Sequence, residues 1–507
     1  MKALLHLFSS HTAAVIFLFM TISMAVKAQS TTPPVFTHST DVGNVKLAGT
    51  SEYNEKEQSY SVSGAGENMW FGKDEFHFVW QEVEGDFLVR ARMTFKGEGM
   101  MAHRKMGLMI RDSLTTGSPQ VSAVVHGDGL TSLQYRRKSG VDTQERKSDM
   151  NGPDVVQLER RGNLFIMSGA TSGEPFDTVQ LEGLSLGKKV YVGLFVCSHN
   201  PEVLETAVFD NVRLVFPAGA DLVPYQDYLG SHLELLNVET GHRKIIYSVP
   251  YSIQAPNWTN NDKSLIFNSK GLIYNYDLAT GTVKKINTGK CKSNNNDHVL
   301  SFDNTMLGIS NHSSKDNTSM VYTLPLSGGK PFQVTRKGPS YLHGWSPDGQ
   351  FLIYTAERNG NYDIYRIPAK GGQETRLTEA EGLDDGSEYS PDGTYIYFNS
   401  ARTGTMQIWR MKPDGSAQEQ ITFDEYNDWF PHVSPDGTRI IFISFGTNVD
   451  AQDHPFYKHV YIRMMPVDGG QAEVIAYLYG GQGTMNVPNW SPDGKHIAFV
   501  SNTGMDR

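Results

Sequence analysis

The amino-acid sequence predicts an all-β protein: an N-terminal β-sandwich followed by a six-bladed β-propeller closed by strands from both ends of that module. Three observations support this prediction. A Ser-Pro-Asp-Gly turn recurs through the second half of the chain, short β-type runs fill the first half, and helical periodicity is absent between them. A chain of 507 residues is long enough for two or three domains with their own cores.

The first 28 residues are predicted to be a secretory signal peptide. Lys2 gives a positive start, residues 13–20 are apolar, and residues 26–28 have the layout of a cleavage site. A retained membrane anchor is the alternative, but a span needs about 20 apolar residues and this run is shorter. No cysteine lies near the predicted cleavage site, so the sequence does not indicate a lipoprotein. We therefore expect a periplasmic or secreted protein without a transmembrane segment.

Charge and cysteine content restrict the classes of partner. The formal net charge is −10, which disfavours nucleic acid or anionic lipid as the main partner. The two cysteines, Cys197 and Cys291, fall in different predicted modules. We expect both thiols to be free and buried, and they say little about function.

Residues 40–216 are predicted to form the β-sandwich, because short apolar or alternating runs are separated by glycine-rich turns. The clearest runs are 87–95, 105–110, 121–125, 132–136, 155–159, 163–167, 190–197 and 206–214. The phrases GLMIRDS (107–113) and SLQYRRK (132–138) resemble concanavalin-like domains, which are often appended to secreted carbohydrate-active proteins. The resemblance implies a sandwich fold and only weakly a carbohydrate ligand.

Residues 217–230 mix proline, glycine and polar residues and are predicted to be a short linker. The propeller is predicted over residues 231–507. Complete Ser-Pro-Asp-Gly copies begin at 346, 390, 434 and 491, and degenerate copies begin at 259 and 301, which gives six blades. The last copy is followed by a single strand, so residues 232–247 should supply the missing outer strands. These turns and their flanking strands resemble TolB-like propellers, a likeness that implies the fold and says little about function.

The candidate site is predicted at one mouth of the propeller channel, where residues that precede the repeated turns are expected to converge. Imidazoles and carboxylates suit a divalent metal or proton transfer, and a guanidinium steadies negative charge. The predicted metal ligands are His298, His343 and His432, for one ion of Mn, Zn or Ca. The predicted catalytic residues are Glu388, Arg358, Arg402 and His312. The predicted substrate-binding residues are Asp384, Asp385, Trp429, His454, Tyr457, His459 and Gln482.

Two alternatives apply to this set. The polar side chains could satisfy one another and trapped water around the axis, as in many propellers.

Among the aromatic residues, Trp345 and Trp490 are expected in the core, whereas Trp429 and Tyr457 are expected to contact ligand. The chain has no HExxH or CxxC motif, so the site prediction depends on the fold.

Two functions remain open from the sequence. The favoured one is an enzyme, a metal-assisted lyase or hydrolase of oligosaccharides, since the histidines resemble in type the metal site of oligogalacturonate lyases, although those propellers have seven blades. The alternative is a non-catalytic TolB-like binding protein that recognises a glycan or an envelope protein partner. A peptidase is disfavoured because GxSxG occurs once, as GLSLG at 183–187 within the predicted β-sandwich, and not at the strand-to-helix turn that a nucleophile elbow needs.

Overall fold

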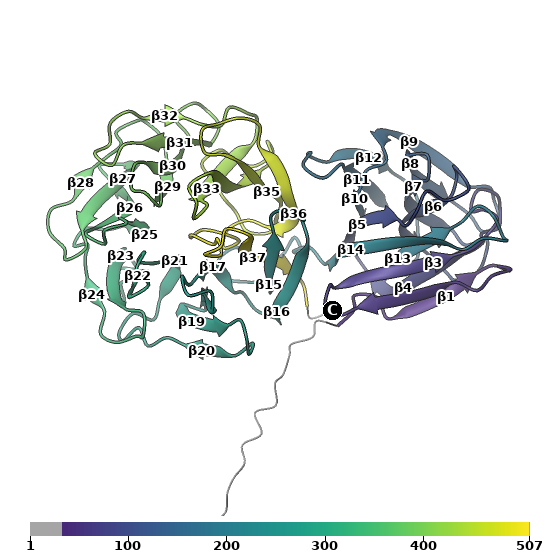
Figure 1. The fold of residues 1–507 in the computed structure, drawn as a ribbon, viewed down its shortest axis with the longest axis horizontal. Helices are drawn as coiled ribbons and strands as arrows, with labels where there is room; N and C mark the ends of the chain where they lie inside the picture. The colour runs from purple at the N-terminus through teal and green to yellow at the C-terminus, as the bar shows by residue number, and fades with distance from the viewer. Residues whose placement is uncertain (1–32, 506–507) are drawn as a thin grey trace, which may run out of the picture.

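The computed structural model describes residues 33–505, and strands are the regular secondary structure of that range. Strands up to Val215 form one module, and strands from Gly230 onward form a second module beside it (Figure 1). The predicted all-β fold class is confirmed. The predicted signal peptide lies outside the described residues. Within residues 33–505, no helix has the length and apolar character needed to cross a membrane.

The N-terminal module consists of two seven-stranded antiparallel sheets that share one core. Val89 and Leu158 of one sheet and Leu108 and Val192 of the other are fully buried in that core. One sheet contains, in spatial order, β1 (His38–Val42), β4 (Phe76–Glu84), β13 (Lys189–Cys197), β6 (Lys105–Arg111), β7 (Gln120–His126), β8 (Leu130–Arg136) and β9 (Gln144–Asn151). The other contains β12 (Asp177–Leu181), β11 (Leu164–Ala170), β10 (Val155–Arg161), β5 (Phe87–Phe95), β14 (Glu205–Val215), β3 (Ser59–Gly64) and β2 (Thr50–Asn54). The resemblance to concanavalin-like domains stays a prediction.

The second module is a ring of six sheets, each running outward from the channel. The first three blades are β17 (Gln254–Trp258), β18 (Ser264–Ser269), β19 (Leu272–Asp277) and β20 (Val283–Lys285); β21 (Asn294–Leu300), β22 (Met306–His312), β23 (Ser319–Pro325) and β24 (Phe332–Gln333); and β25 (Ser340–Trp345), β26 (Phe351–Arg358), β27 (Asn361–Pro368) and β28 (Thr375–Arg376). The next two are β29 (Asp384–Tyr389), β30 (Ile396–Ser400), β31 (Gln407–Met411) and β32 (Glu419–Gln420); and β33 (Asn427–Val433), β34 (Arg439–Phe445), β35 (Lys458–Pro466) and β36 (Glu473–Gly480).

The sixth blade closes the ring with strands from both ends of the module. It contains β15 (Gly230–Asn237), β16 (Arg243–Val249) and β37 (His496–Thr503), with β15 between the other two. Gly230 pairs with Thr503 and Asn237 with His496 in an unbroken antiparallel register. A bridge between Trp490 and Ile497 adds the innermost segment. The predicted six-bladed ring and its closure are therefore confirmed.

The chemistry of the repeated turn explains its recurrence. Ser346 Oγ donates to Asp348 Oδ1 at 2.6 Å and accepts the Phe351 N–H at 2.9 Å, and the other three copies repeat both bonds. The fourth residue has a left-handed backbone, with φ of 67–72° at the glycines. In the degenerate copies Asn304 and Asp262 take this position at φ of 61° and 57°, because short polar side chains tolerate it best after glycine.

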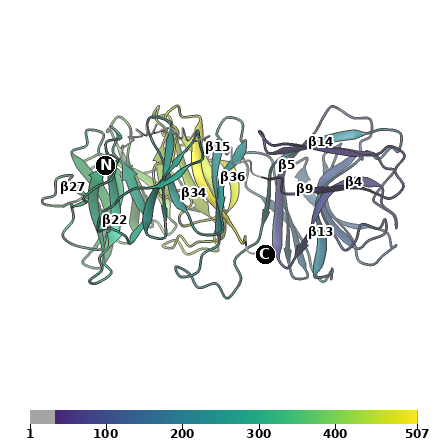
Figure 2. The ribbon, with the colours of Figure 1, turned by 90° about the horizontal axis from the view of Figure 1, so that it is seen from below.

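Buried ionic contacts join the two modules, and both views place β15 and β36 at the side that meets the sandwich (Figures 1 and 2). Glu234 of β15 accepts hydrogen bonds from Arg213 Nη2 of β14 at 2.6 Å and from Arg243 Nη2 of β16 at 2.8 Å. Arg90 of β5 donates to the carbonyl of Tyr477 in β36. The modules are therefore tied by charged groups that have left water, in addition to their covalent connection.

The connecting segment 217–230 packs on the propeller. Leu222 and Leu229 contact Tyr457 and Tyr479 in a small apolar cluster. Two further side chains of this segment, Tyr225 and Tyr228, reach the pocket described below. The segment is thus part of the wall of the candidate site.

Candidate functional site

One mouth of the propeller channel opens into a pocket of about 950 Å³. Every blade contributes to its lining, either from its innermost strand or from the segment leading into it. The ionisable side chains of the lining are Lys270, Asp297, His312, His343, Asp385 and His454. The amide side chains are Gln254, Asn268, Asn294, Asn295, Asn296, Gln452, Gln482 and Asn486. The aromatic side chains are Tyr225, Tyr228, Tyr251, Tyr341, Tyr362, Phe430 and Phe456.

β-bulges in the innermost strands shape this mouth. The register shifts within β17, β21, β25, β29 and β33. A bulge leaves one residue unpaired and re-aims its side chain. In β25 the shift lies between Leu342 and Gly344, so His343 is the unpaired residue. In β29 the shift follows Asp385 directly, and Gly386 there adopts a φ of 62°.

Asp385 is the centre of a charged group in the pocket. Its Oδ1 lies 2.9 Å from His343 Nε2, and its Oδ2 lies 3.8 Å from His454 Nε2. Burial disfavours both charges, but the Asp385–His343 attraction outweighs it. The pKa of Asp385 is therefore held well below its usual range, and the pKa of His343 is raised. This pair favours an ionised carboxylate beside an imidazolium.

Asp297 lies in the same pocket without a strong cationic partner. Its carboxylate accepts a hydrogen bond from Asn295 Nδ2 at 2.6 Å. Burial raises the pKa of Asp297 to about 6; the charge of Asp385 acts in the same direction, and that of His343 opposes it. Among the described residues, no lysine or arginine forms an ion pair with this carboxylate. A buried carboxylate of this kind is stabilised by any cation that enters the pocket.

Phe430 forms the apolar floor between the two histidines. Its ring lies 6.0 Å from the ring of His343 and 5.3 Å from that of His454, between centroids. The residue has a φ of 55°, a region that bulky side chains rarely adopt. Asn399 Oδ1 accepts the Phe430 N–H at 3.0 Å and helps to hold this backbone. Strained positions of this kind cluster at binding sites.

The structure brings part of the predicted site together. Five predicted residues line the pocket, namely His312, His343, Asp385, His454 and Gln482. His312 is at the rim, where its Nδ1 lies 2.9 Å from the Asn317 carbonyl oxygen.

The three predicted metal ligands do not converge. His298 is fully buried, and its Nε2 lies 3.2 Å from the Ile266 carbonyl oxygen. His432 Nδ1 lies 2.5 Å from Glu388 Oε2, and its Nε2 lies 2.7 Å from the Met485 carbonyl oxygen. Only His343 of the three lines the pocket. The geometry therefore gives no support in the described residues to one ion shared by these histidines, or to Glu388 as a base facing the pocket.

The two predicted substrate arginines are tied to their own blades. Arg358 Nη2 lies 3.0 Å from Glu374 Oε2. Arg402 Nη2 lies 2.8 Å from Asp384 Oδ2, and its guanidinium stacks on Trp409 at 4.7 Å from the ring centre. Arg358, Arg402 and Asp384 are absent from the pocket lining. Ion pairs within single blades hold all three side chains and explain why none of them lines the pocket.

The remaining predicted contacts lie in the core or between the modules. Trp429 is fully buried and meets the ring of His454 edge-on at 4.4 Å. The Tyr457 hydroxyl accepts a hydrogen bond from the linker backbone at 3.0 Å. His459 Nε2 lies 3.7 Å from Glu159 Oε2 of the N-terminal module. None of these three lines the pocket.

Depth along the innermost strand explains why Glu388 and His432, each two residues before a repeated turn, do not line the pocket. A strand rises about 3.3 Å per residue, so residues next to the repeated turns lie deep in the channel. Glu388 is three residues beyond Asp385 on β29 and is accordingly below the pocket. Tyr341 and Phe430 lie nearer the strand starts and reach the pocket, and sequence reasoning missed them. A distance of four or more residues from the turn favours such positions, but His343 and His298 are each three residues from a turn and only His343 lines the pocket.

Comparison with known proteins places this chain among propellers of one kind. Residues 343–458 match the family model described as the TolB beta propeller domain. An uncharacterized protein of Agrobacterium fabrum is 46% identical over 271 residues, which cover 53% of this chain and 92% of that protein. A solved structure from Agrobacterium tumefaciens, provisionally assigned as TolB, is 44% identical, with 55% of this chain and 100% of that chain covered and a TM-score of 0.53.

These relatives overturn the expectation of an oligosaccharide lyase or hydrolase. An oligogalacturonate lyase solved in complex with manganese is 14% identical to this chain, with a TM-score of 0.35 over 50% of this chain and 72% of that one. A likeness at that level carries no argument about function. Of the relatives at 44% and 46% identity, the first has a provisional TolB assignment and the second is uncharacterized. The lyase interpretation is therefore wrong as the primary one.

Proposed function

Because this chain belongs to the TolB-like β-propeller family, we propose that it is a non-catalytic, extracytoplasmic binding protein whose propeller pocket receives a segment of a partner polypeptide. The predicted signal peptide supports the extracytoplasmic setting. Amide side chains in the pocket offer donors and acceptors that match peptide groups, and the tyrosines and Phe430 offer ring faces for side chains.

The observation that carries the proposal is the buried Asp297 carboxylate. It lines an open pocket, it pairs with no lysine or arginine of the described residues, and its raised pKa reflects the cost of an ionised group there. Lys270, the cationic side chain in the lining, stacks on Tyr251 at 4.6 Å from the ring centre. A lysine or arginine of the partner would form an ion pair with Asp297 and compensate for the water that its carboxylate loses on burial. The bound segment is therefore expected to be cationic.

Selection from a random 12-residue peptide library tests this proposal. We expect peptides that bind the wild-type protein to be enriched in lysine or arginine. Asp297→Asn should weaken their binding about 10- to 100-fold, since a hydrogen bond to a charged group contributes about 1.5–3 kcal/mol. Glu379→Gln, which removes an exposed carboxylate outside the pocket, is the matched control and should bind as wild type does. Isothermal titration calorimetry measures each affinity.

Two results would contradict the proposal. Peptides that bind wild type and Asp297→Asn equally would place recognition away from this carboxylate. A library that yields no binder, alongside binding of neutral oligosaccharides in the same assay, would replace the polypeptide with a glycan.

Acid should weaken binding of the selected peptides. Asp297 has a raised pKa of about 6, so it is largely ionised at pH 7.5 and largely protonated at pH 5. Only the ionised form attracts a cation, so protonation of Asp297 removes the attraction. We expect the dissociation constant to rise up to about tenfold from pH 7.5 to pH 5 in wild type, because the ionised fraction of Asp297 falls by that factor, and to change less in Asp297→Asn. Equal pH dependence in both proteins would contradict this assignment.

A further inference from the structure

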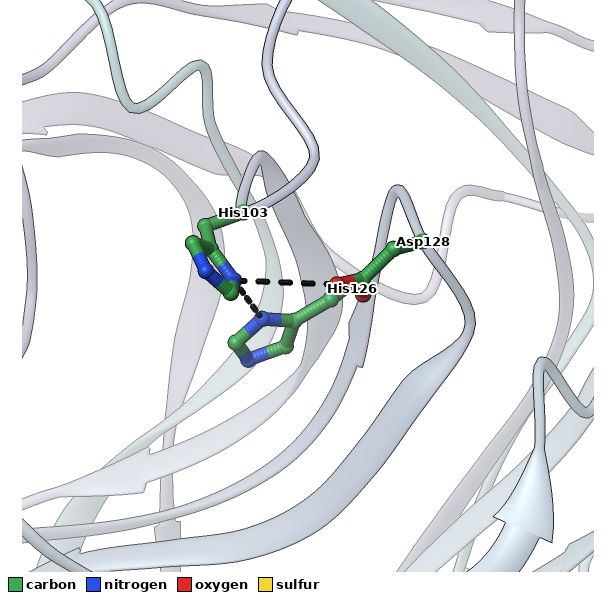
Figure 3. Close-up of side chains that lie close together, drawn as sticks. All are labelled: His103, His126 and Asp128. Carbon is green, nitrogen blue, oxygen red and sulfur yellow. Dashed lines mark hydrogen bonds and ion pairs between the residues drawn. The ribbon is translucent and has the colours of Figure 1, made fainter.

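A second cluster of polar side chains lies in the N-terminal module, at one end of its sheets (Figure 3). His103 precedes β6, His126 ends β7, and Asp128 is in the turn between β7 and β8. His103 Nδ1 lies 3.4 Å from His126 Nδ1 and 3.9 Å from Asp128 Oδ2. One ligand atom from each of the three residues lies within 4.8 Å of the other two. Two segments that are separate in sequence, the one before β6 and the β7–β8 hairpin, thus bring donor atoms together.

We propose that His103, His126 and Asp128 form a binding site for a divalent transition-metal ion, zinc before the others. Two imidazoles and one carboxylate are a set that zinc accepts, with ligand bonds of about 2.0–2.2 Å. Ligands of a tetrahedral ion at that range are about 3.3–3.5 Å apart, close to the 3.4 and 3.9 Å found here. The hard cations calcium and magnesium prefer all-oxygen sites and fit this set poorly.

The surroundings of His126 suit a metal ligand. His126 is 6% exposed, and the Gln134 side-chain amide nitrogen lies 3.2 Å from its Nε2. With that amide turned over, its oxygen would accept a hydrogen bond from Nε2–H and leave the Nδ1 lone pair free for a metal ion. Lys105, opposite His126 on β6, carries the charge that opposes a cation, and Asn68 Oδ1 holds its ammonium at 3.1 Å.

A third histidine lies beside the cluster. The ring of His199 is 5.7 Å from that of His103, between centroids. Its Nδ1 is buried and has no hydrogen-bond partner. An unpartnered buried nitrogen is costly, so its position beside His103 is an independent indication of a ligand at this end of the module. Because His199 lies outside the group of mutually close donor atoms, water would fill the fourth coordination position.

The ion would add a side-chain link between two loops whose backbones are hydrogen-bonded, from the Gly127 N–H to the Arg104 carbonyl and from the Asp128 N–H to the Ala102 carbonyl. His103 belongs to the segment between β5 and β6, which also contains the exposed Met100 and Met101. Asp128 belongs to the opposite β7–β8 turn. Metal binding would cross-link the side chains of the two and stabilise this end of the module. The site is in a different module from the propeller pocket, and its test does not depend on the proposed function.

Calorimetric titration of zinc chloride into the untagged, chelator-treated protein tests the site. We expect one zinc ion per chain. His103→Ala and Asp128→Asn should each weaken binding at least tenfold, because even the loss of an outer-shell partner costs about 10- to 100-fold. His38→Ala is the matched control, since it removes an exposed histidine of the same module. Cobalt in place of zinc should give a visible absorption band in wild type and lose it in His103→Ala.

Thermal unfolding separates a ligand role from a folding role. The His103 side chain is 55% exposed, so metal-free His103→Ala should unfold at the wild-type temperature. Zinc should raise the unfolding temperature of wild type and leave that of His103→Ala unchanged. Equal zinc affinity in the two proteins, or no stoichiometric zinc in wild type, would overturn the proposal.

Discussion

Replacing Glu234 with glutamine is expected to lower the free energy of unfolding by about 3–5 kcal/mol. Glu234 is fully buried and accepts hydrogen bonds from Arg213, at the end of the sandwich module, and from Arg243 on the neighbouring propeller strand. Removing one partner of a buried ionic group leaves uncompensated charge, which costs about 3–5 kcal/mol. Here two guanidinium groups would lose their counterion at once. Urea unfolding followed by tryptophan fluorescence measures the change.

The same substitution should separate the unfolding of the two modules. The Glu234–Arg213 contact crosses the boundary between them, so its loss weakens their coupling as well as each local fold. We expect one unfolding transition in wild type to become two in Glu234→Gln, as independent domains give. Glu239→Gln, in the exposed turn that follows β15, is the control and should stay within about 0.5 kcal/mol of wild type. A Glu234→Gln protein as stable as the control would mean that water reaches this network.

The acid dependence of stability provides an internal check. Burial alone would raise the pKa of Glu234, but the charges of Arg213 and Arg243 outweigh burial and hold it well below the ordinary value of 4.5. A depressed folded-state pKa contributes stability above the unfolded pKa, and that contribution is lost as pH falls through the folded value. Wild type should therefore lose stability below about pH 4.5 more steeply than Glu234→Gln does.

The repeated turn made the propeller predictable, because it is a local motif whose chemistry is complete within six residues. In the copy at 346, the Ser346 hydroxyl bonds to Asp348 and to the Phe351 N–H, and Gly349 takes the left-handed backbone that the turn needs. Each copy therefore marks one blade. The closure by β15 and β37 followed from the same count, since the last copy lacks outer strands and an open sheet edge is unfavourable.

The site was less predictable because it depends on bulges and depth. His343 faces the pocket as the unpaired residue of a bulge, and the sequence has no mark for that. Arg358 was expected to hold a substrate, but Glu374, 16 residues later, pairs with it on the same blade. His103 and His126 are 23 residues apart with no metal-binding spacing. Such contacts follow from strand register, which short motifs do not specify.

Replacing Trp429 with alanine is expected to destabilise the propeller by about 3–5 kcal/mol, the usual cost of deleting a large buried aromatic side chain. Trp429 was expected from the sequence to stack on ligand, yet it is fully buried among β33 and its neighbours. Because its ring contacts His454 at 4.4 Å, the cavity should also loosen this wall of the pocket. Urea unfolding gives the stability, and calorimetry with a selected peptide gives the binding.

Trp429→Phe distinguishes packing from recognition. The Trp429 Nε1 is buried without a hydrogen-bond partner, so phenylalanine loses volume but also removes an unsatisfied donor, whose burial costs about 1–3 kcal/mol. We therefore expect Trp429→Phe to be much closer to wild type than Trp429→Ala in both stability and binding. A Trp429→Ala protein of wild-type stability that fails to bind would instead restore this residue to the ligand surface. Our structure opposes that outcome, because a ring with no exposed area has no face left for a ligand.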